Sequence, residues 1–114
     1  MKLPSRFRRK SVLLIILSKS PFTCDFDSIL KMAAEMTEMG EKVGILFNQD
    51  ACIALTLPEY LRKNVGHNIE LYGLKADCEA RRLFKKIGKR VTIIDYRGWV
   101  KLVMDKHDKI VSWI

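Results

Sequence analysis

Residues 11–27 read SVLLIILSKSPFTCDFD, and this stretch decides the fold. Its aliphatic run, residues 12–17, is too short to cross a membrane and too uniformly apolar for a strand with one face in water, so we expect a fully buried central strand. The strand should stop at residues 18–21, SKSP. Cys24 follows, just before the acidic and capping residues that open a helix. We therefore expect Cys24 where a buried strand meets a helix amino terminus, the usual place for chemistry in an open α/β sheet.

Length and cysteine content indicate one domain with free thiols. The 114 residues are enough to bury about two-thirds of the surface that the unfolded chain would expose. Three widely spaced cysteines do not form a disulfide framework. Free thiols favour a reducing compartment, and we expect a cytoplasmic protein.

The net charge of +8 is concentrated at the amino terminus. Residues 1–10, MKLPSRFRRK, carry five of the 21 basic residues, which leaves sixteen basic against thirteen acidic residues from Ser11 onward. The segment resembles the start of a secretory signal, but the apolar run after it is short and no small-residue cleavage site follows. We interpret residues 1–10 as a flexible basic arm and residues 11–114 as a single α/β domain. No segment is long enough to span a bilayer, so no membrane partner is expected.

Apolar periodicity predicts four strand–helix units followed by a last strand. We expect strands at 12–17, 42–48, 69–74, 91–94 and 109–113, and helices at 25–39, 49–55 with a restart near Pro58, 76–87 and 96–106. Strands that alternate with helices in this way favour a parallel sheet with right-handed crossovers and helices on both faces. The predicted fold class is therefore α/β.

Three cysteines follow three successive strands, each near the strand's carboxyl end. Cys24, Cys52 and Cys78 should thus lie toward one edge of the sheet, among helix amino termini that favour a thiolate. Lys19, Lys75 and Arg81 could stabilise it further. Cysteine is also a common buried filler, and we interpret Cys52, between small and apolar residues, in that way. For Cys78 filler and function stay open, whereas the polar surroundings of Cys24 favour function.

The histidines and glycines argue against other chemistries. His67 and His107 precede strands and so belong to the opposite edge, where neither can act as the base of a cysteine hydrolase. The cysteine spacings contain no CxxC pair and no nearby fourth ligand, so no metal is expected. No glycine-rich loop follows any strand, so no nucleotide cofactor is expected either. Asp95 ends the fourth strand and should cap the next helix.

Four short segments together resemble a known family. They are SKSPF at 18–22, YGLKADCEARRL at 72–83, IDYRGWVKLV at 94–103 and VSWI at 111–114. In this order and spacing they are similar to the DsrE/DsrF/DsrH superfamily of sulfur-relay proteins, with its DsrH and TusB branch closest. The resemblance implies a three-layer α/β/α fold with a five-stranded parallel sheet. It also implies homo- or hetero-oligomers of such subunits that pass persulfide sulfur between donor and acceptor proteins, in tRNA thiolation or in sulfur oxidation.

The chain departs from the family's pattern at the sulfur-carrying cysteine. In DsrE-like members that cysteine stands seven residues before the arginine that Arg81 resembles, where this chain has Leu74. In DsrH-like members it stands roughly where Ile29 is. The family's functional thiol is therefore not carried over onto Cys24 or Cys78.

Three functions remain open at this point. The first is a sulfur carrier that uses Cys24, with Cys78 in reserve. The second is a non-catalytic subunit that binds partners through an apolar surface made by Trp99, Val100, Val103 and Trp113. The third, which we do not favour, is binding of RNA or an acidic protein through the basic arm and the third helix. The basic residues of that helix region are Arg81, Arg82, Lys85, Lys86, Lys89 and Arg90.

Overall fold

The structure is a computed structural model that describes residues 12–23, 25–66, 68–106 and 109–113. The expected basic arm, Cys24 and both histidines lie outside these residues. Within the described part of the chain, no helix is both long enough and apolar enough to cross a membrane.

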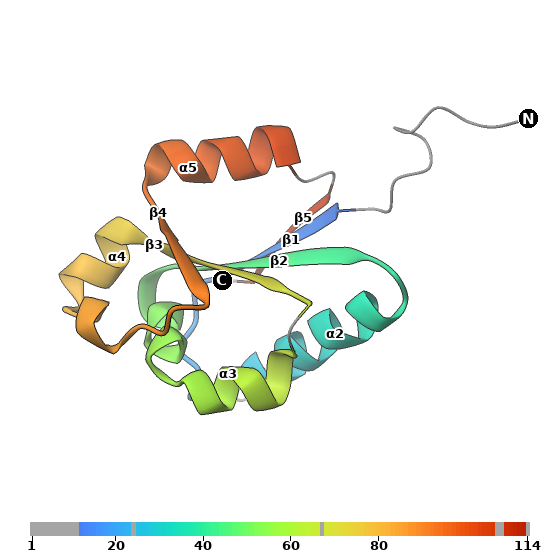
Figure 1. Cartoon of the computed structure of the whole chain (residues 1–114), viewed down its shortest axis with the longest axis horizontal. Helices are drawn as coiled ribbons and strands as arrows, with labels where there is room; N and C mark the ends of the chain where they lie inside the picture. Colours follow the sequence, from blue (N-terminus) through green and yellow to red (C-terminus); the bar gives the residue numbers. More distant parts are fainter. Residues whose placement is uncertain (1–11, 24, 67, 107–108, 114) are drawn as a thin grey trace, which may run out of the picture.

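One five-stranded sheet organises the molecule (Figure 1). Its strand order is β4-β3-β2-β1-β5, and every neighbouring pair is parallel, as predicted. The strands are β1 (Val12–Leu17), β2 (Lys42–Phe47), β3 (Glu70–Leu74), β4 (Val91–Ile94) and β5 (Lys109–Trp113). The three-layer α/β/α class is confirmed.

Strand β1 lies between β2 and β5, which explains why its sequence is apolar throughout. Leu17 is opposite Phe47 of β2 and Trp113 of β5. Leu13, Ile15 and Leu17 pack into the larger core cluster, whereas Leu14 and Ile16 pack into a second cluster on the other face. Because both faces of β1 are covered, alternation of polar and apolar residues is absent.

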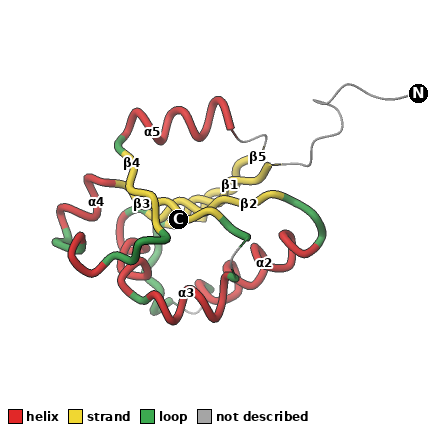
Figure 2. The backbone as a smooth tube through the Cα atoms, in the orientation of Figure 1, coloured by secondary structure: helices red, strands yellow, loops and turns green. Residues whose placement is uncertain are grey.

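Helices cover the two faces unequally (Figure 2). One face carries α2 (Phe26–Glu38), the 3-10 helix η1 (Gln49–Thr56), α3 (Pro58–Val65) and α4 (Lys75–Ala80). The other face carries α5 (Tyr96–Lys101) and its continuation η3 (Leu102–Lys106), a π-helical stretch. The Asp95 carboxylate accepts a hydrogen bond from the Gly98 N–H at 2.8 Å, so the predicted cap is confirmed.

The helix expected at 76–87 is wrong in its length. Helix α4 ends at Ala80, Arg82 takes a left-handed φ of 55°, and a short 3-10 turn, η2 (Phe84–Lys86), follows. The Leu83 N–H then donates to the Cys78 carbonyl at 3.0 Å. A twelve-residue helix would be about 18 Å long, whereas the four residues of β4 span only about 13 Å. The crossover to β4 therefore leaves the helical path early and keeps Leu83 against the core.

Candidate functional site

The loop after β1 is anchored to the neighbouring strand. The buried Ser18 hydroxyl donates a hydrogen bond of 2.6 Å to the side-chain carbonyl of Asn48, which directly follows β2. The Ser20 carbonyl accepts from both the N–H and the hydroxyl of Thr23, at 3.1 and 2.7 Å. Cys24 itself lies outside the described residues. Asn48 ends the strand expected at 42–48, and its role as an anchor was missed by the sequence analysis, although a polar residue at the end of a buried strand was a usable signal.

The strand order makes β1 the topological switch point of the sheet. From β1 the chain moves outward through β2, β3 and β4, and then returns to place β5 on the other side of β1. In open α/β sheets, ligands bind beyond the carboxyl ends of the strands at such a point. Residues 18–23 leave the sheet here, and Cys24 follows them in the sequence.

The other two cysteines lie together in the interior. Cys52 comes from η1 and Cys78 from α4, their thiols share a hydrogen bond, and the exposed fraction of each side chain is 0%. The Cys52 sulfur also lies 3.4 Å from the Phe47 carbonyl oxygen, at the end of β2. The sequence therefore placed these two cysteines correctly at one edge, but did not predict that they touch.

The shared hydrogen bond acts on the two thiols in opposite directions. It raises the pKa of Cys52, and burial raises it further. It lowers the pKa of Cys78, against the opposing effects of burial and of Asp77. Cys78 is therefore the member of the pair with the lower pKa and the one that ionises first. A thiolate is a nucleophile and a sulfur acceptor, but the Cys78 sulfur is enclosed by protein.

Two polar contacts hold α4 and η1 together beside the thiol pair. The Asp77 carboxylate accepts a hydrogen bond from the Gln49 N–H at 2.7 Å, and Gln49 has a left-handed φ of 46°. The Arg81 guanidinium donates to the Asp50 carboxylate at 3.1 Å. We call these four residues the α4–η1 clamp. Asp50 and Asp77 were not recognised in the sequence because their partners are 31 and 28 residues away.

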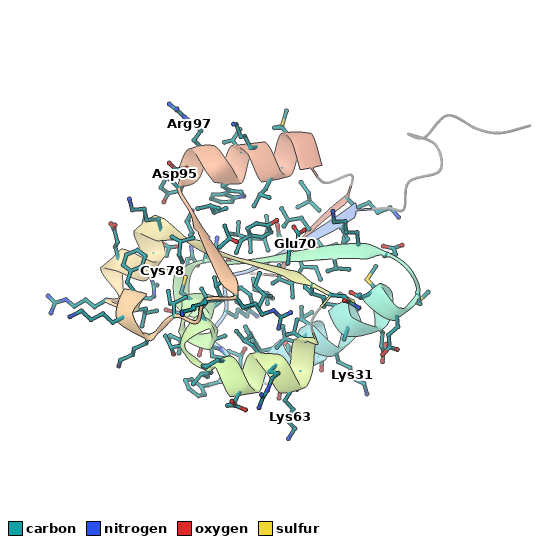
Figure 3. The ribbon with its side chains drawn as sticks, in the orientation of Figure 1. Lys31, Lys63, Glu70, Cys78, Asp95 and Arg97 are labelled. Atoms are coloured by element: carbon teal, nitrogen blue, oxygen red, sulfur yellow. The ribbon has the colours of Figure 1, made fainter. Side chains whose placement is uncertain are left out.

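Behind Cys78, the backbone of β3 leaves no spare space. A Cβ atom added to Gly73 would lie 3.4 Å from the Cys78 sulfur and 2.7 Å from the Leu55 Cδ1 atom. Leu74, at the position where DsrE-like proteins carry their cysteine, is only 2% exposed. Figure 3 shows Cys78 among side chains between α4 and the sheet.

An apolar groove runs beside α5 and η3 on the opposite face of the sheet. Its volume is about 470 Å³, and its wall contains two aromatic rings, Tyr96 and Trp99, whose centroids are 6.0 Å apart. The exposed fractions of Val100 and Met104 are 60% and 74%. The groove is lined by Ile16, Tyr96, Trp99, Val100, Val103, Met104 and Ile110. Trp99, Val100 and Val103 of the predicted apolar surface thus come together in the groove. The structure describes the backbone of Trp113 but not its side chain.

Metal-ligating side chains do not gather in the described residues. Among residues 12–23, 25–66, 68–106 and 109–113, no group of three or more His, Cys, Asp or Glu side chains could hold an ion.

Comparisons with known proteins agree on one family. Residues 19–110 match the model of the family described as DsrH like protein. A Protein TusB from Photorhabdus laumondii is 34% identical over 102 residues, which are 89% of this chain and 100% of that protein. A Protein TusB from Erwinia tasmaniensis is 35% identical over 98 residues, and one from Escherichia coli K12 is 29% identical over 97 residues. Each of these two matches covers 85% of this chain and 96% of the relative.

The fold also occurs in a solved structure. The crystal structure of the ychN protein from E. coli superposes with a TM-score of 0.71 and covers 91% of this chain and 99% of that one. The two sequences are 13% identical, so this likeness concerns the fold alone.

Proposed function

This chain belongs to the family of DsrH-like proteins, and on that premise we propose that it is a subunit of a cytoplasmic sulfur relay. In this role it accepts persulfide sulfur from a donor protein and passes it to an acceptor within an oligomer of DsrE/F/H-like subunits. Relatives named TusB favour a relay of the tRNA-thiolation type.

We propose Cys24 as the thiol that carries the sulfur. The observation that supports this choice is the complete burial of the alternatives, since Cys52 and Cys78 are both 0% exposed. Cys24 belongs to the segment that leaves β1 at the switch point, and the residues beside it, Thr23 and Asp25, are exposed. A carrier must reach the sulfur atoms of two other proteins, so a position in sequence between two exposed residues suits the task.

The proposed transfer needs no outside oxidant. The Cys24 thiolate attacks the outer sulfur of the donor persulfide, the donor's S–S bond breaks, and the donor thiolate leaves with the bonding electron pair. Cys24 then holds the sulfur as Cys24–S–SH. An acceptor thiolate attacks that outer sulfur in turn, and the Cys24 thiolate is released.

Cys78 is the second candidate carrier. The Cys52 hydrogen bond lowers the pKa of Cys78, which favours the nucleophilic form. Its use would require α4 to separate from η1, because the α4–η1 clamp and the packing around Gly73 enclose the sulfur.

A second function, a non-catalytic subunit of the same relay, is favoured by two observations. Leu74 stands in place of the cysteine of DsrE-like proteins, and the groove beside α5 offers an almost wholly apolar surface to a partner subunit. In that case the chain completes an oligomer whose partner carries the sulfur.

Mass spectrometry of the intact protein separates these functions. After incubation with a protein persulfide donor and removal of the donor, the wild-type chain should gain the mass of one sulfur atom, and Cys24→Ser should gain none. Cys78→Ser is the matched control and should gain as much as the wild type. If only Cys78→Ser fails to gain the mass of a sulfur atom, Cys78 is the sulfur carrier. If the wild-type chain gains no mass and its native mass shows a stable oligomer, the chain is a non-catalytic subunit.

A further inference from the structure

The segment between Glu79 and Asp95 is strongly basic. It contains six basic and no acidic residues: Arg81, Arg82, Lys85, Lys86, Lys89 and Arg90. We call residues 81–90 the basic loop. Arg81 is held by Asp50 in the α4–η1 clamp, whereas the other five basic side chains are exposed. In the described part of the chain, none of the three lysines of the basic loop takes part in an ion pair.

The break in the helix changes how these charges are presented. Because α4 ends at Ala80 and Arg82 is left-handed, the cations are spread over a turn instead of one stripe of a helix. The same break leaves Phe84 with 41% of its surface exposed, directly before Lys85 and Lys86. An exposed aromatic ring among cations is the arrangement on which unpaired nucleic-acid bases stack.

A pocket of about 260 Å³ opens beside the carboxyl end of the basic loop. Leu55, Leu61, Leu71 and Val91 provide apolar walls, and Arg62 and Arg90 also line it. The Arg90 guanidinium is fixed by a hydrogen bond of 3.1 Å to the Ile69 carbonyl. Glu59 also lines the pocket, and its carboxylate is paired with Arg62. An apolar slot with guanidinium groups beside it suits a flat heterocycle attached to a phosphate chain.

We propose that the basic loop and this pocket form a binding site for single-stranded RNA. The exposed lysines of the loop neutralise successive phosphates, Phe84 stacks on one base, and the pocket receives another. The carboxylates of an acidic peptide would satisfy the lysines equally well, but Asp and Glu side chains have no flat ring to stack on Phe84 or to fill the pocket. Double-stranded RNA keeps its bases stacked inside the helix, so it has no free base to stack on Phe84 or to enter the pocket. This site is independent of whether Cys24 carries sulfur.

Binding can be measured on the full chain by fluorescence anisotropy with a labelled single-stranded oligouridylate of about ten nucleotides. The triple variant Lys85→Ala/Lys86→Ala/Lys89→Ala should bind at least about tenfold more weakly at low salt. The slope of log affinity against log salt should fall by about 2, since each phosphate contact with single strands contributes about 0.7. Phe84→Leu should bind about tenfold more weakly with the slope unchanged, because it removes stacking but no charge.

A matched triple variant controls for general charge. Lys31→Ala/Lys63→Ala/Lys101→Ala removes three lysines from α2, α3 and α5, and should weaken binding less than about threefold; Figure 3 shows Lys31 and Lys63 on α2 and α3. Equal losses in the two triple variants would overturn the proposal, because diffuse charge would then explain binding. Polyglutamate that displaces the RNA as well as unlabelled oligouridylate would assign the surface to acidic proteins instead. Absence of binding at low salt would also overturn it.

Discussion

Arg81 and Asp50 are joined by a hydrogen-bonded ion pair of 3.1 Å that ties the end of α4 to the start of η1. With the bond between Asp77 and the Gln49 N–H, it closes the α4–η1 clamp beside Cys52 and Cys78. The Arg81 and Asp50 side chains are 31% and 64% exposed, so the pair itself contributes only about 0–1 kcal/mol to stability. We expect its larger effect to be on access to the thiols.

Asp50→Ala, which releases Arg81 at the end of α4 but keeps its positive charge near the thiol, should therefore make Cys78 more reactive without unfolding the protein. We expect the rate of alkylation of Cys78 by iodoacetamide at neutral pH to rise up to about fivefold, since opening becomes easier by up to about 1 kcal/mol. Peptide mass spectrometry measures the rate. Lys75→Ala, on the exposed start of the same helix, is the control and should leave the rate unchanged. Equal acceleration in both variants would contradict a specific role for the clamp.

Gly73→Ala should destabilise the fold by about 1–3 kcal/mol through overpacking. Its new Cβ would approach Leu55 to 2.7 Å and Ile93 to 3.2 Å, and the Leu55 side chain is fully buried. Urea unfolding measures the change. Gly88→Ala is the matched control, because its Cβ would meet only Pro58 at 3.8 Å. If Gly88→Ala lowers the free energy of unfolding as much as Gly73→Ala does, the packing argument is wrong.

Stability should fall at alkaline pH, and Tyr60 should contribute to the fall. Burial and the hydrogen bond to the Asp27 carboxylate raise the pKa of Tyr60 above its ordinary 10.0. The folded state therefore holds this proton more tightly than the unfolded state. The stabilisation is complete below pH 10.0 and is lost as the pH rises toward the folded pKa. Tyr60→Phe should show a smaller drop in urea midpoint between about pH 9 and about pH 11 than the wild type.

Tyr96→Phe is the control for the alkaline prediction. Tyr96 is 57% exposed on α5, and its substitution should leave the pH dependence as in the wild type. If both phenylalanine variants lose stability with pH as steeply as the wild type, the Tyr60 hydroxyl is not a source of the effect.

The groove beside α5 gives a prediction about assembly. Val100→Asp places a carboxylate on a residue that is 60% exposed and lines the groove, so it should leave the melting temperature within about 2 °C. If a partner subunit covers the groove, the same change buries an unpaired charge in the interface and should shift the native mass toward the monomer. Arg97→Asp, an exposed residue of α5 outside the groove lining, should leave the native mass unchanged. An unaffected oligomer in Val100→Asp would show that the groove stays free.

The strands were predictable because their signal is local. The run from Leu13 to Leu17 had to be buried on both faces, and the alternation of strands with helices implied the parallel sheet that the structure contains. The edge shared by Cys52 and Cys78 followed from that topology. The point where the third helix ends could not be predicted from the sequence, because residues 76–87 retain a helical apolar pattern up to Ile87. The short crossover to β4 overrides that pattern at Arg82.

The sequence by itself determined the fold class and which strand each cysteine comes after. Both depend on apolar runs and on the order of strands and helices, which are properties of neighbouring residues. Only the tertiary structure decided that Cys52 and Cys78 come together, that Asp50 reaches Arg81, and that one helix leaves a groove open beside β5. These contacts join segments distant along the chain. Their distances depend on how helices pack against a twisted sheet, and no local pattern of residues records that packing.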